Sequence, residues 1–344
     1  MSARLAALAL AFFCAALMAE AGTVRLATWH LELDRRGPGL LLRDIRRGDD
    51  PRIGAIAGVI ATVAPDVLVV QGVDYDHHLR ALAALRDRIA EEGPHYPHLF
   101  ALRPNTGRPT GLDMDGDGRR GGPRDAQGYG SFSGRGGMAI LSRHPVDRDG
   151  VRDFSAMLWR DLPGARLPRW PDGRPFPSEE AQAVQRLSSV GHWAVPVRLP
   201  SGPLTLLAFH ATTPVFDGEE DRNGRRNHDE IRFWQRYLDG GFGPAPARRF
   251  VLIGDANLDP GRGAGRRGAI RALLADARLR DPLPGRATVD WEQTGPLRVS
   301  YALPSADLGV GAAGVHWPPE GAPGRAAAEL AGPHRLVWVD VAVE

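Results

Sequence analysis

The sequence predicts an α/β protein in which two stacked sheets are covered by helices. Short apolar runs bounded by Gly and Pro recur along the chain, and helical patterns lie between several of them. Strand–helix alternation near the N-terminus then gives way to pairs of strands. The 344 residues are 43% hydrophobic and 24% charged, which is typical of a globular protein with a sizeable core.

The elements follow from local patterns. Apolar runs predict strands at residues 24–28, 67–71, 139–141, 193–199, 204–209, 250–253, 299–303 and 336–343. Apolar residues at helical spacing predict helices at 53–63, 78–91, 225–237 and 269–276. Residues 103–137 and 161–177 show neither period, and such long loops in a compact domain are often functional. No linker or internal repeat is evident, so we expect one domain over residues 22–344.

Residues 1–21 have the features of a signal peptide. Arg4 gives a positive start, residues 5–18 form an apolar run, and Ala19-Glu20-Ala21 is a small-x-small cleavage site. The run is too short for a transmembrane helix, which needs about 20 apolar residues. We therefore expect cleavage after residue 21 and a secreted or periplasmic protein without a transmembrane segment. The signal does not distinguish these two compartments.

Composition excludes several chemistries. Cys14 is the only cysteine and lies in the segment expected to be removed, which excludes disulfides, thiolate ligands and a cysteine nucleophile. All 43 basic residues are Arg, which excludes lysine Schiff bases and a P-loop lysine. The net charge is +2 without a polybasic tract, so a nucleic acid is not demanded as the partner. The sequence indicates no protein partner.

Polar residues follow several of the predicted strands. Asp255 and Asn257 lie in Gly254-Asp255-Ala256-Asn257, directly after an apolar run, and His210 ends the preceding strand. Glu32, Gln71 and His334 lie beside other strands. A carboxylate can orient water or bind a cation, and an amide can donate to a phosphoryl oxygen. We expect these side chains to converge on one cleft at a sheet edge.

The order of these motifs resembles the endonuclease/exonuclease/phosphatase superfamily, which is DNase-I-like. The resemblance covers about residues 23–344, and residues 214–230 resemble the secreted bacterial subgroup. It rests on Trp29-His30-Leu31-Glu32, Gln71, Leu141-Ser142-Arg143-His144-Pro145, Phe209-His210, Gly254-Asp255-Ala256-Asn257, Tyr301 to Ser305 and His334-Arg335.

The resemblance implies a four-layer α/β/β/α sandwich with two mostly antiparallel sheets, and a metal-dependent phosphoester hydrolase. The substrate would be a small molecule or a nucleic acid, cleaved by a phosphodiesterase, nuclease or phosphatase. His210 would contact phosphate, Asp255 would align water, Asn257 would hold the oxyanion, and His334 would bind phosphate or act as an acid or base.

The resemblance also implies a catalytic Mg²⁺ or Mn²⁺ held near Glu32 and Gln71. The chain departs from the family at four positions: His30 replaces Asn, Gln71 replaces Glu, and Ser300 and Pro333 each replace Asp. Asp74 and Asp76 are close enough in sequence to compensate for Gln71. The alternative is a catalytically degenerate member that binds a phosphorylated ligand.

Two further groups are candidates. Arg222, Asn223 and Arg226 either bind phosphate or form a structural turn. Carboxylates at positions 1, 3 and 5 with Gly at position 6 resemble the start of a calcium loop. Its ligands would be Asp113, Asp115, Asp117 and Asp125, and Ca²⁺ would order the loop, whereas an acidic solvated loop is the alternative.

Overall fold

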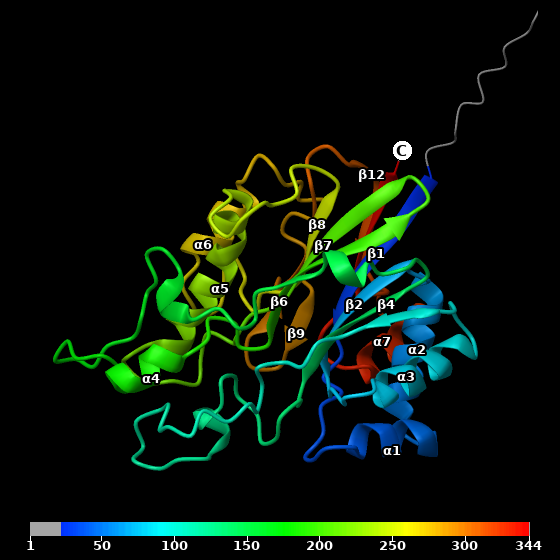
Figure 1. Cartoon of the computed structure of the whole chain (residues 1–344). Coiled ribbons are helices and arrows are strands. Elements are labelled where there is room, and N and C mark those ends of the chain that lie inside the picture. Colours follow the sequence, from blue (N-terminus) through cyan, green and yellow to red (C-terminus); the bar gives the residue numbers. More distant parts are fainter. Residues whose placement is uncertain (1–21, 344) are drawn as a thin grey trace, which may run out of the picture.

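The computed structural model describes residues 22–343, so the predicted signal peptide lies outside the described residues. Two sheets pack face to face (Figure 1). The first has the order β12-β13-β1-β2-β4-β3, with β1 (Gly22–His30), β2 (Val67–Val73), β3 (His98–Phe100), β4 (Gly137–Ser142), β12 (Gly309–Val315) and β13 (Val337–Val343). The second has the order β11-β8-β7-β6-β5, with β5 (Arg152–Asp153), β6 (Gly191–Leu199), β7 (Gly202–His210), β8 (Phe250–Asp255) and β11 (Ser300–Pro304).

Helices cover the outer face of each sheet (Figure 1). The first sheet packs against α1 (Leu40–Arg47), α2 (Pro51–Val63), α3 (Arg80–Ala90) and α7 (Arg325–Leu330). The second packs against α5 (Arg222–Leu238) and α6 (Gly268–Leu274). The remaining elements are a ribbon of β9 (Val289–Trp291) and β10 (Gly295–Leu297), helix α4 (Glu179–Val184), and short 3₁₀ turns at Pro123–Asp125, Arg148–Gly150 and Trp159–Asp161.

Alternation along the strands explains the layers. In β1, Leu26 packs between the sheets, whereas Ala27 and Trp29 contribute to the core under the helices. In β7, Leu206 packs between the sheets and Leu207 faces the other way. Because successive side chains of a strand point to opposite faces, each sheet contributes to two cores. The predicted α/β/β/α sandwich is confirmed.

One parallel pair in each sheet brings strand ends together. β1 is parallel to β2 and β7 is parallel to β8, whereas the other pairs are antiparallel. The register places His30 opposite Gln71 and His210 opposite Asp255. Ser300, the first residue of β11, also lies opposite Asp255. Polar residues at the carboxyl ends of four strands therefore share one end of the sandwich.

All the strands and helices expected from the sequence are present, with ends shifted by a few residues. The sequence did not predict α1, α4, α7, β3, β5, β9, β10 or β12. β12 is rich in Gly and Ala, three of its seven residues are exposed and the other four are partly buried, so it lacks the apolar alternation that marks a strand. Among residues 22–343, no helix has the length and apolar character needed to cross a membrane.

Candidate active site

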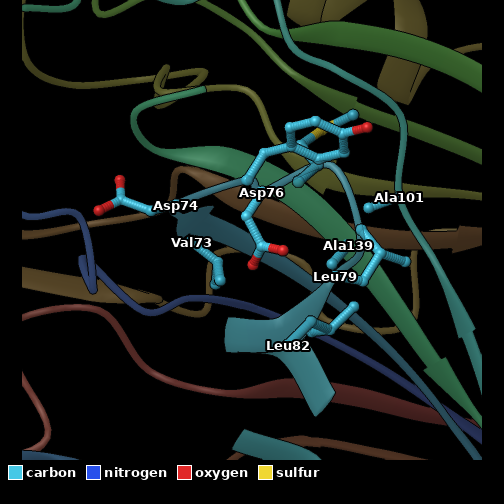
Figure 2. Close-up of a pocket in the computed structure, with 9 residues that line it drawn as sticks. Val73, Asp74, Asp76, Leu79, Leu82, Ala101 and Ala139 are labelled. Carbon is cyan, nitrogen blue, oxygen red and sulfur yellow. The ribbon is translucent and has the colours of Figure 1, made fainter. Parts of the chain in front are cut away.

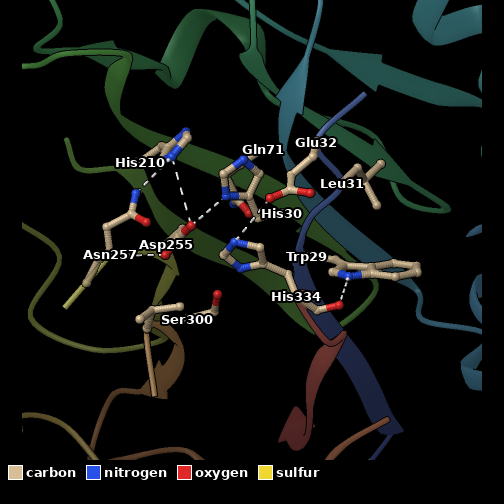
Figure 3. A network of polar contacts seen from close by, with 12 residues as sticks. Trp29, His30, Leu31, Glu32, Gln71, His210, Asp255, Asn257, Ser300 and His334 are labelled. Carbon is tan, nitrogen blue, oxygen red and sulfur yellow. Dashed lines mark hydrogen bonds and ion pairs between the residues drawn. The ribbon is translucent and has the colours of Figure 1, made fainter. Parts of the chain in front are cut away.

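Three histidines, a carboxylate and an amide meet where the two sheets approach each other (Figure 3). His30 ends β1, His210 ends β7 and Asp255 ends β8. Asn257 follows β8, and His334 precedes β13. The predicted convergence of His210, Asp255, Asn257 and His334 is therefore present in the geometry, and His30 lies at its centre.

The link between the sheets is a hydrogen bond from His30 to Asp255. The His30 Nδ1 atom lies 2.8 Å from Asp255 Oδ2, while Asp255 Oδ1 accepts from the Asn257 backbone amide at 2.9 Å. Burial alone would raise the pKa of Asp255, but the bond from His30 and the nearby histidines lower it to about 2. Burial opposes protonation of His30, yet Asp255 raises its pKa above the usual value. The pair therefore favours the ionised carboxylate and the protonated imidazole.

His210 and His334 flank His30. Their ring centroids lie 4.7 Å and 4.4 Å from that of His30. Burial and then the charge of His30 lower the pKa of both residues to about 3, so both are neutral near pH 7. The Nδ1 atom of each is buried, with no hydrogen-bond partner among residues 22–343. These nitrogens are available to a ligand.

Asn257 is fixed by its backbone and by its amide. Its φ angle is 50°, a left-handed conformation that Asn tolerates better than most residues. Its Nδ2 atom donates to the Ala211 carbonyl at 2.9 Å and lies 3.2 Å from His210 Nε2. The amide is thereby held beside Asp255 and His210, where a phosphoryl oxygen can take the place of the His210 contact.

Two glycines make room for the site. Gly72 has a φ angle of 71°, and a Cβ there would lie 2.7 Å from the His30 ring. Gly254 has a φ angle of 150°, and a Cβ there would lie 2.0 Å from the Phe209 carbonyl oxygen. Any side chain at these positions would displace His30 or separate β7 from β8, because neither space can hold a methyl group.

The expected oxygen ligands do not form one cluster. Gln71 is fully buried. Its Nε2 atom donates to the Thr28 hydroxyl at 2.9 Å, and that hydroxyl lies 3.3 Å from Gln71 Oε1. Glu32 lies at the site, with Oε1 3.8 Å from His334 Nε2, but its Oε2 accepts from Arg52 at 3.1 Å. Only Glu32 of the three predicted ligands therefore presents a carboxylate to the histidines.

Asp74 lies elsewhere, beside a small pocket behind β2 (Figure 2). Its oxygens accept from the backbone amides of Arg35 and Gly136, each at 2.9 Å, and burial raises its pKa to about 6. Asp76 accepts from three amides at the start of α3 and caps that helix. Neither carboxylate therefore supplies the negative charge that is lost at the site where Gln71 replaces Glu.

The α5 residues have different surroundings. Arg226 is buried and donates to the carbonyl oxygens of Gln127, Arg186, Leu187 and Ser188, so its guanidinium is occupied inside the protein. Asn223 donates to the Val215 carbonyl, and Arg222 donates to Gln185. All three line a cavity of about 380 Å³, which Thr212 also lines. For Arg226, these contacts agree with the structural role given as the alternative to phosphate binding.

Three of the four predicted calcium ligands lie together. Asp113, Asp115 and Asp117 each offer an oxygen within 4.8 Å of the others. Asp125 is not part of this group, because its oxygens accept from the Met114 and Gly122 backbone amides, both at 2.8 Å. It fixes the course of the loop instead.

His30 was not predicted as a site residue, because the sequence showed it only as a departure from the family pattern. Its position two residues before the predicted ligand Glu32 was the signal that could have identified it. Two tryptophans contact His334. Trp29 donates from Nε1 to the His334 carbonyl at 3.0 Å, and the Trp291 ring lies 5.3 Å from that of His334 at 85°.

Comparison with known families gives one match. Residues 40–332 match the Endonuclease/Exonuclease/phosphatase family, which is most of the chain. No curated protein matched the sequence.

Solved structures share the fold. A family protein from Beutenbergia cavernae is 20% identical with a TM-score of 0.56, over 93% of this chain and 72% of its own. A family protein from Leptotrichia buccalis is 15% identical with a TM-score of 0.55, over 92% and 99%. Truncated TDP2 from Caenorhabditis elegans is 14% identical with a TM-score of 0.50, over 93% and 97%. At these identities the similarity shows the fold alone.

We expect the chelator-treated protein to lose stability as the pH falls from about 6.5 toward 3. The unfolded chain protonates His210 and His334 near their ordinary pKa of about 6.5, but the folded protein holds both pKa values at about 3. Each contributes a limiting slope of about 1.4 kcal/mol per pH unit between these values. Because the pKa of His30 is raised, its contribution to the free energy of unfolding changes only above pH 6.5, so it does not oppose this trend. Urea denaturation at successive pH values measures the slope.

The control is a pair of histidine variants. His210→Asn removes one titrating group and should flatten the slope, whereas His95→Asn, at an exposed position, should leave it unchanged. Equal slopes for His210→Asn and the wild type would contradict the role given to burial.

Proposed function

The chain belongs to the endonuclease/exonuclease/phosphatase family, and from that premise we propose that it is a phosphoester hydrolase acting through His210, Asp255, Asn257 and His334. The observation that carries the proposal is the convergence of these residues from both sheets on His30 (Figure 3). A phosphoester needs a base for water and donors for the phosphoryl oxygens, and both kinds of group are present.

Each residue has a role that its contacts support. Asp255 stays ionised and can align the attacking water, because His30 and the Asn257 amide stabilise its charge. Asn257 can donate from Nδ2 to the oxyanion. His210 and His334 are neutral, and a neutral imidazole offers one N–H donor and one acceptor nitrogen. Their unpartnered Nδ1 atoms can therefore donate a hydrogen bond to a phosphoryl oxygen or accept a proton, depending on the tautomer.

A second candidate is a protein that binds a phosphorylated ligand without cleaving it. The observation that favours it is the pair of unpartnered atoms, Ser300 Oγ and His334 Nδ1, in the described chain. The family resemblance places a carboxylate at position 300, where it would orient the catalytic histidine. Without that carboxylate His334 lacks tautomer control and support for its charged form.

Members of this family typically depend on a divalent cation. The residues present do not fit Mg²⁺, which prefers near-octahedral oxygen ligands. Gln71 and Asp74 are held by other groups, and Glu32 shares its carboxylate with Arg52. No step of the proposed reaction is therefore assigned to Mg²⁺ at Glu32, Gln71 and Asp74.

We further propose that Ca²⁺ binds Asp113, Asp115 and Asp117 and orders the loop of residues 103–137. The three oxygens lie within reach of one ion, and Asp113 already accepts from the Gly116 and Gly118 amides at 2.6 Å and 2.8 Å. Oxygen ligands in a flexible loop suit Ca²⁺. The loop would then be held in place beside the cavity that Asp115 and Arg222 line.

The hydrolase proposal predicts turnover of bis-p-nitrophenyl phosphate, p-nitrophenyl phosphate or plasmid DNA by the purified protein. Asp255→Asn should lower kcat/KM by about 10²–10⁴-fold and Asn257→Ala by about 10²–10³-fold. Initial rates measured with Mg²⁺, Mn²⁺, Zn²⁺, Ca²⁺ and EDTA test this. Asp87→Asn, at an exposed site on α3, is the matched control and should keep full activity.

Turnover that persists in Asp255→Asn would come from a contaminant and would overturn the assignment. No turnover by the folded wild type with any substrate or ion, together with binding of inorganic phosphate, would favour the binding protein.

The calcium proposal predicts that Ca²⁺ raises the Tm of the wild type by about 3 °C or more at saturating concentration. Asp113→Ala should abolish the rise, because it removes one ligand and three hydrogen bonds from backbone amides of the turn. Scanning calorimetry with and without Ca²⁺ measures the difference, with Asp87→Asn as the control. A rise of the same size in Asp113→Ala would show that Ca²⁺ acts elsewhere.

We also propose that the protein is exported with cleavage after Ala21, as in the secreted bacterial subgroup. N-terminal sequencing of the protein from periplasm and medium should give Gly22 as the first residue. Recovery only from the cytoplasm with Met1 retained would contradict export.

A further inference from the structure

The donor atoms at the active site are rich in nitrogen. His30, Asp255 and His334 each offer one ligand atom, and these atoms lie within 4.8 Å of one another. They come from β1, from β8 and from the residues before β13, so both sheets contribute (Figure 3). We propose that this group binds one borderline transition-metal cation such as Zn²⁺, in place of the Mg²⁺ that the family resemblance implies.

The choice of metal follows from the ligand types. Imidazole nitrogen suits Zn²⁺ and its neighbours in the first transition row, whereas Mg²⁺ takes carboxylate, carbonyl and water oxygens. Two histidines and one carboxylate are a ligand set found in catalytic zinc sites, which leave one position open. His30 is decisive, because an Asn at this position would offer an oxygen where this chain offers a nitrogen.

The ligands are held in place by their neighbours. The Asn257 backbone amide donates to Asp255 Oδ1 at 2.9 Å, which leaves Oδ2 directed at His30. The Trp29 indole fixes the backbone of His334 at 3.0 Å. Such outer contacts orient first-shell ligands in metalloproteins. The three side chains are therefore held close together, and an ion that binds them displaces the proton shared by His30 and Asp255.

Burial supports a ligand at this place. Asp255 is fully buried and His334 is 2% exposed, and the His334 Nδ1 atom has no partner within residues 22–343. A buried polar atom without a partner costs about 1–3 kcal/mol. The His30 side chain is 16% exposed, so it gives an ion access from solvent. A bound cation would place positive charge where a phosphoryl oxygen can approach.

The proposal rests on the proposed function and refines it: with the ion bound, Asp255 and His334 would act as its ligands, and His210 and Asn257 would keep the contacts to the phosphoryl oxygens. Binding is measurable without turnover. Chelator-stripped protein is titrated with Zn²⁺, Co²⁺ and Mg²⁺, and bound metal is counted by mass spectrometry. All proteins compared carry Asp113→Ala, which removes the acidic loop as a competing site. The visible spectrum of the Co²⁺ form reports nitrogen ligation directly and needs no further variant.

We expect one Zn²⁺ or Co²⁺ per chain, retained against a thousandfold excess of Mg²⁺. His30→Asn and His334→Gln should each weaken binding by at least about 100-fold, the upper range for loss of a mere outer contact. His95→Asn, at an exposed position, should bind as the parent does. Circular dichroism melts confirm that each variant is folded.

A Co²⁺ spectrum typical of oxygen-only ligation would overturn the inference, and so would Zn²⁺ binding that His30→Asn leaves unchanged. Tight Zn²⁺ binding without hydrolysis would contradict the proposed function and support the metal site. Hydrolysis with Mg²⁺ and no specific Zn²⁺ binding would support the proposed function and contradict the metal site.

Discussion

The hydrogen bond between His30 and Asp255 is the contact on which the site depends. It joins β1 of the first sheet to β8 of the second, and both strands are central in their sheets. Asp255 is fully buried, and an unpaired carboxylate in that position would cost several kcal/mol. The bond therefore does two things: it stabilises the charge of Asp255, and it fixes the distance between the two sheets at their functional end.

The remaining histidines are arranged around that pair by strand register. Because β7 and β8 are parallel, His210 lies opposite Asp255, and the antiparallel pairing of β11 brings Ser300 to the same place. His334 is delivered by the segment that enters β13, with its backbone held by Trp29. Ser300 Oγ has no hydrogen-bond partner within the described chain, so the orienting role that the family resemblance gives to a carboxylate at position 300 has no equivalent there. The carboxylate partner in this site belongs to His30 instead.

The sequence predicted two stacked sheets covered by helices and the main strands, because apolar runs bounded by Gly and Pro mark buried strands. Polar residues at the ends of those runs predicted the convergence. It did not predict β12, whose Gly and Ala residues carry no such signal. Side-chain direction was the other gap. Gln71 lies in β2 and Asp74 directly follows it, yet one binds Thr28 and the other binds backbone amides. Arg226 looked available for phosphate but lies under a loop whose carbonyl groups it satisfies. Spacing along a chain does not show which partner a side chain finds.

The position of β13 has a consequence for the order of events during synthesis. This strand consists of residues Val337–Val343 and lies between β1 and β12, so a partner of the first strand is made last. His334 stands directly before it and reaches His30 only when that pairing forms. A nascent chain in which residues 334–343 are still inside the ribosome therefore has no complete cluster. The three histidines can meet only after β13 has emerged and paired with β1.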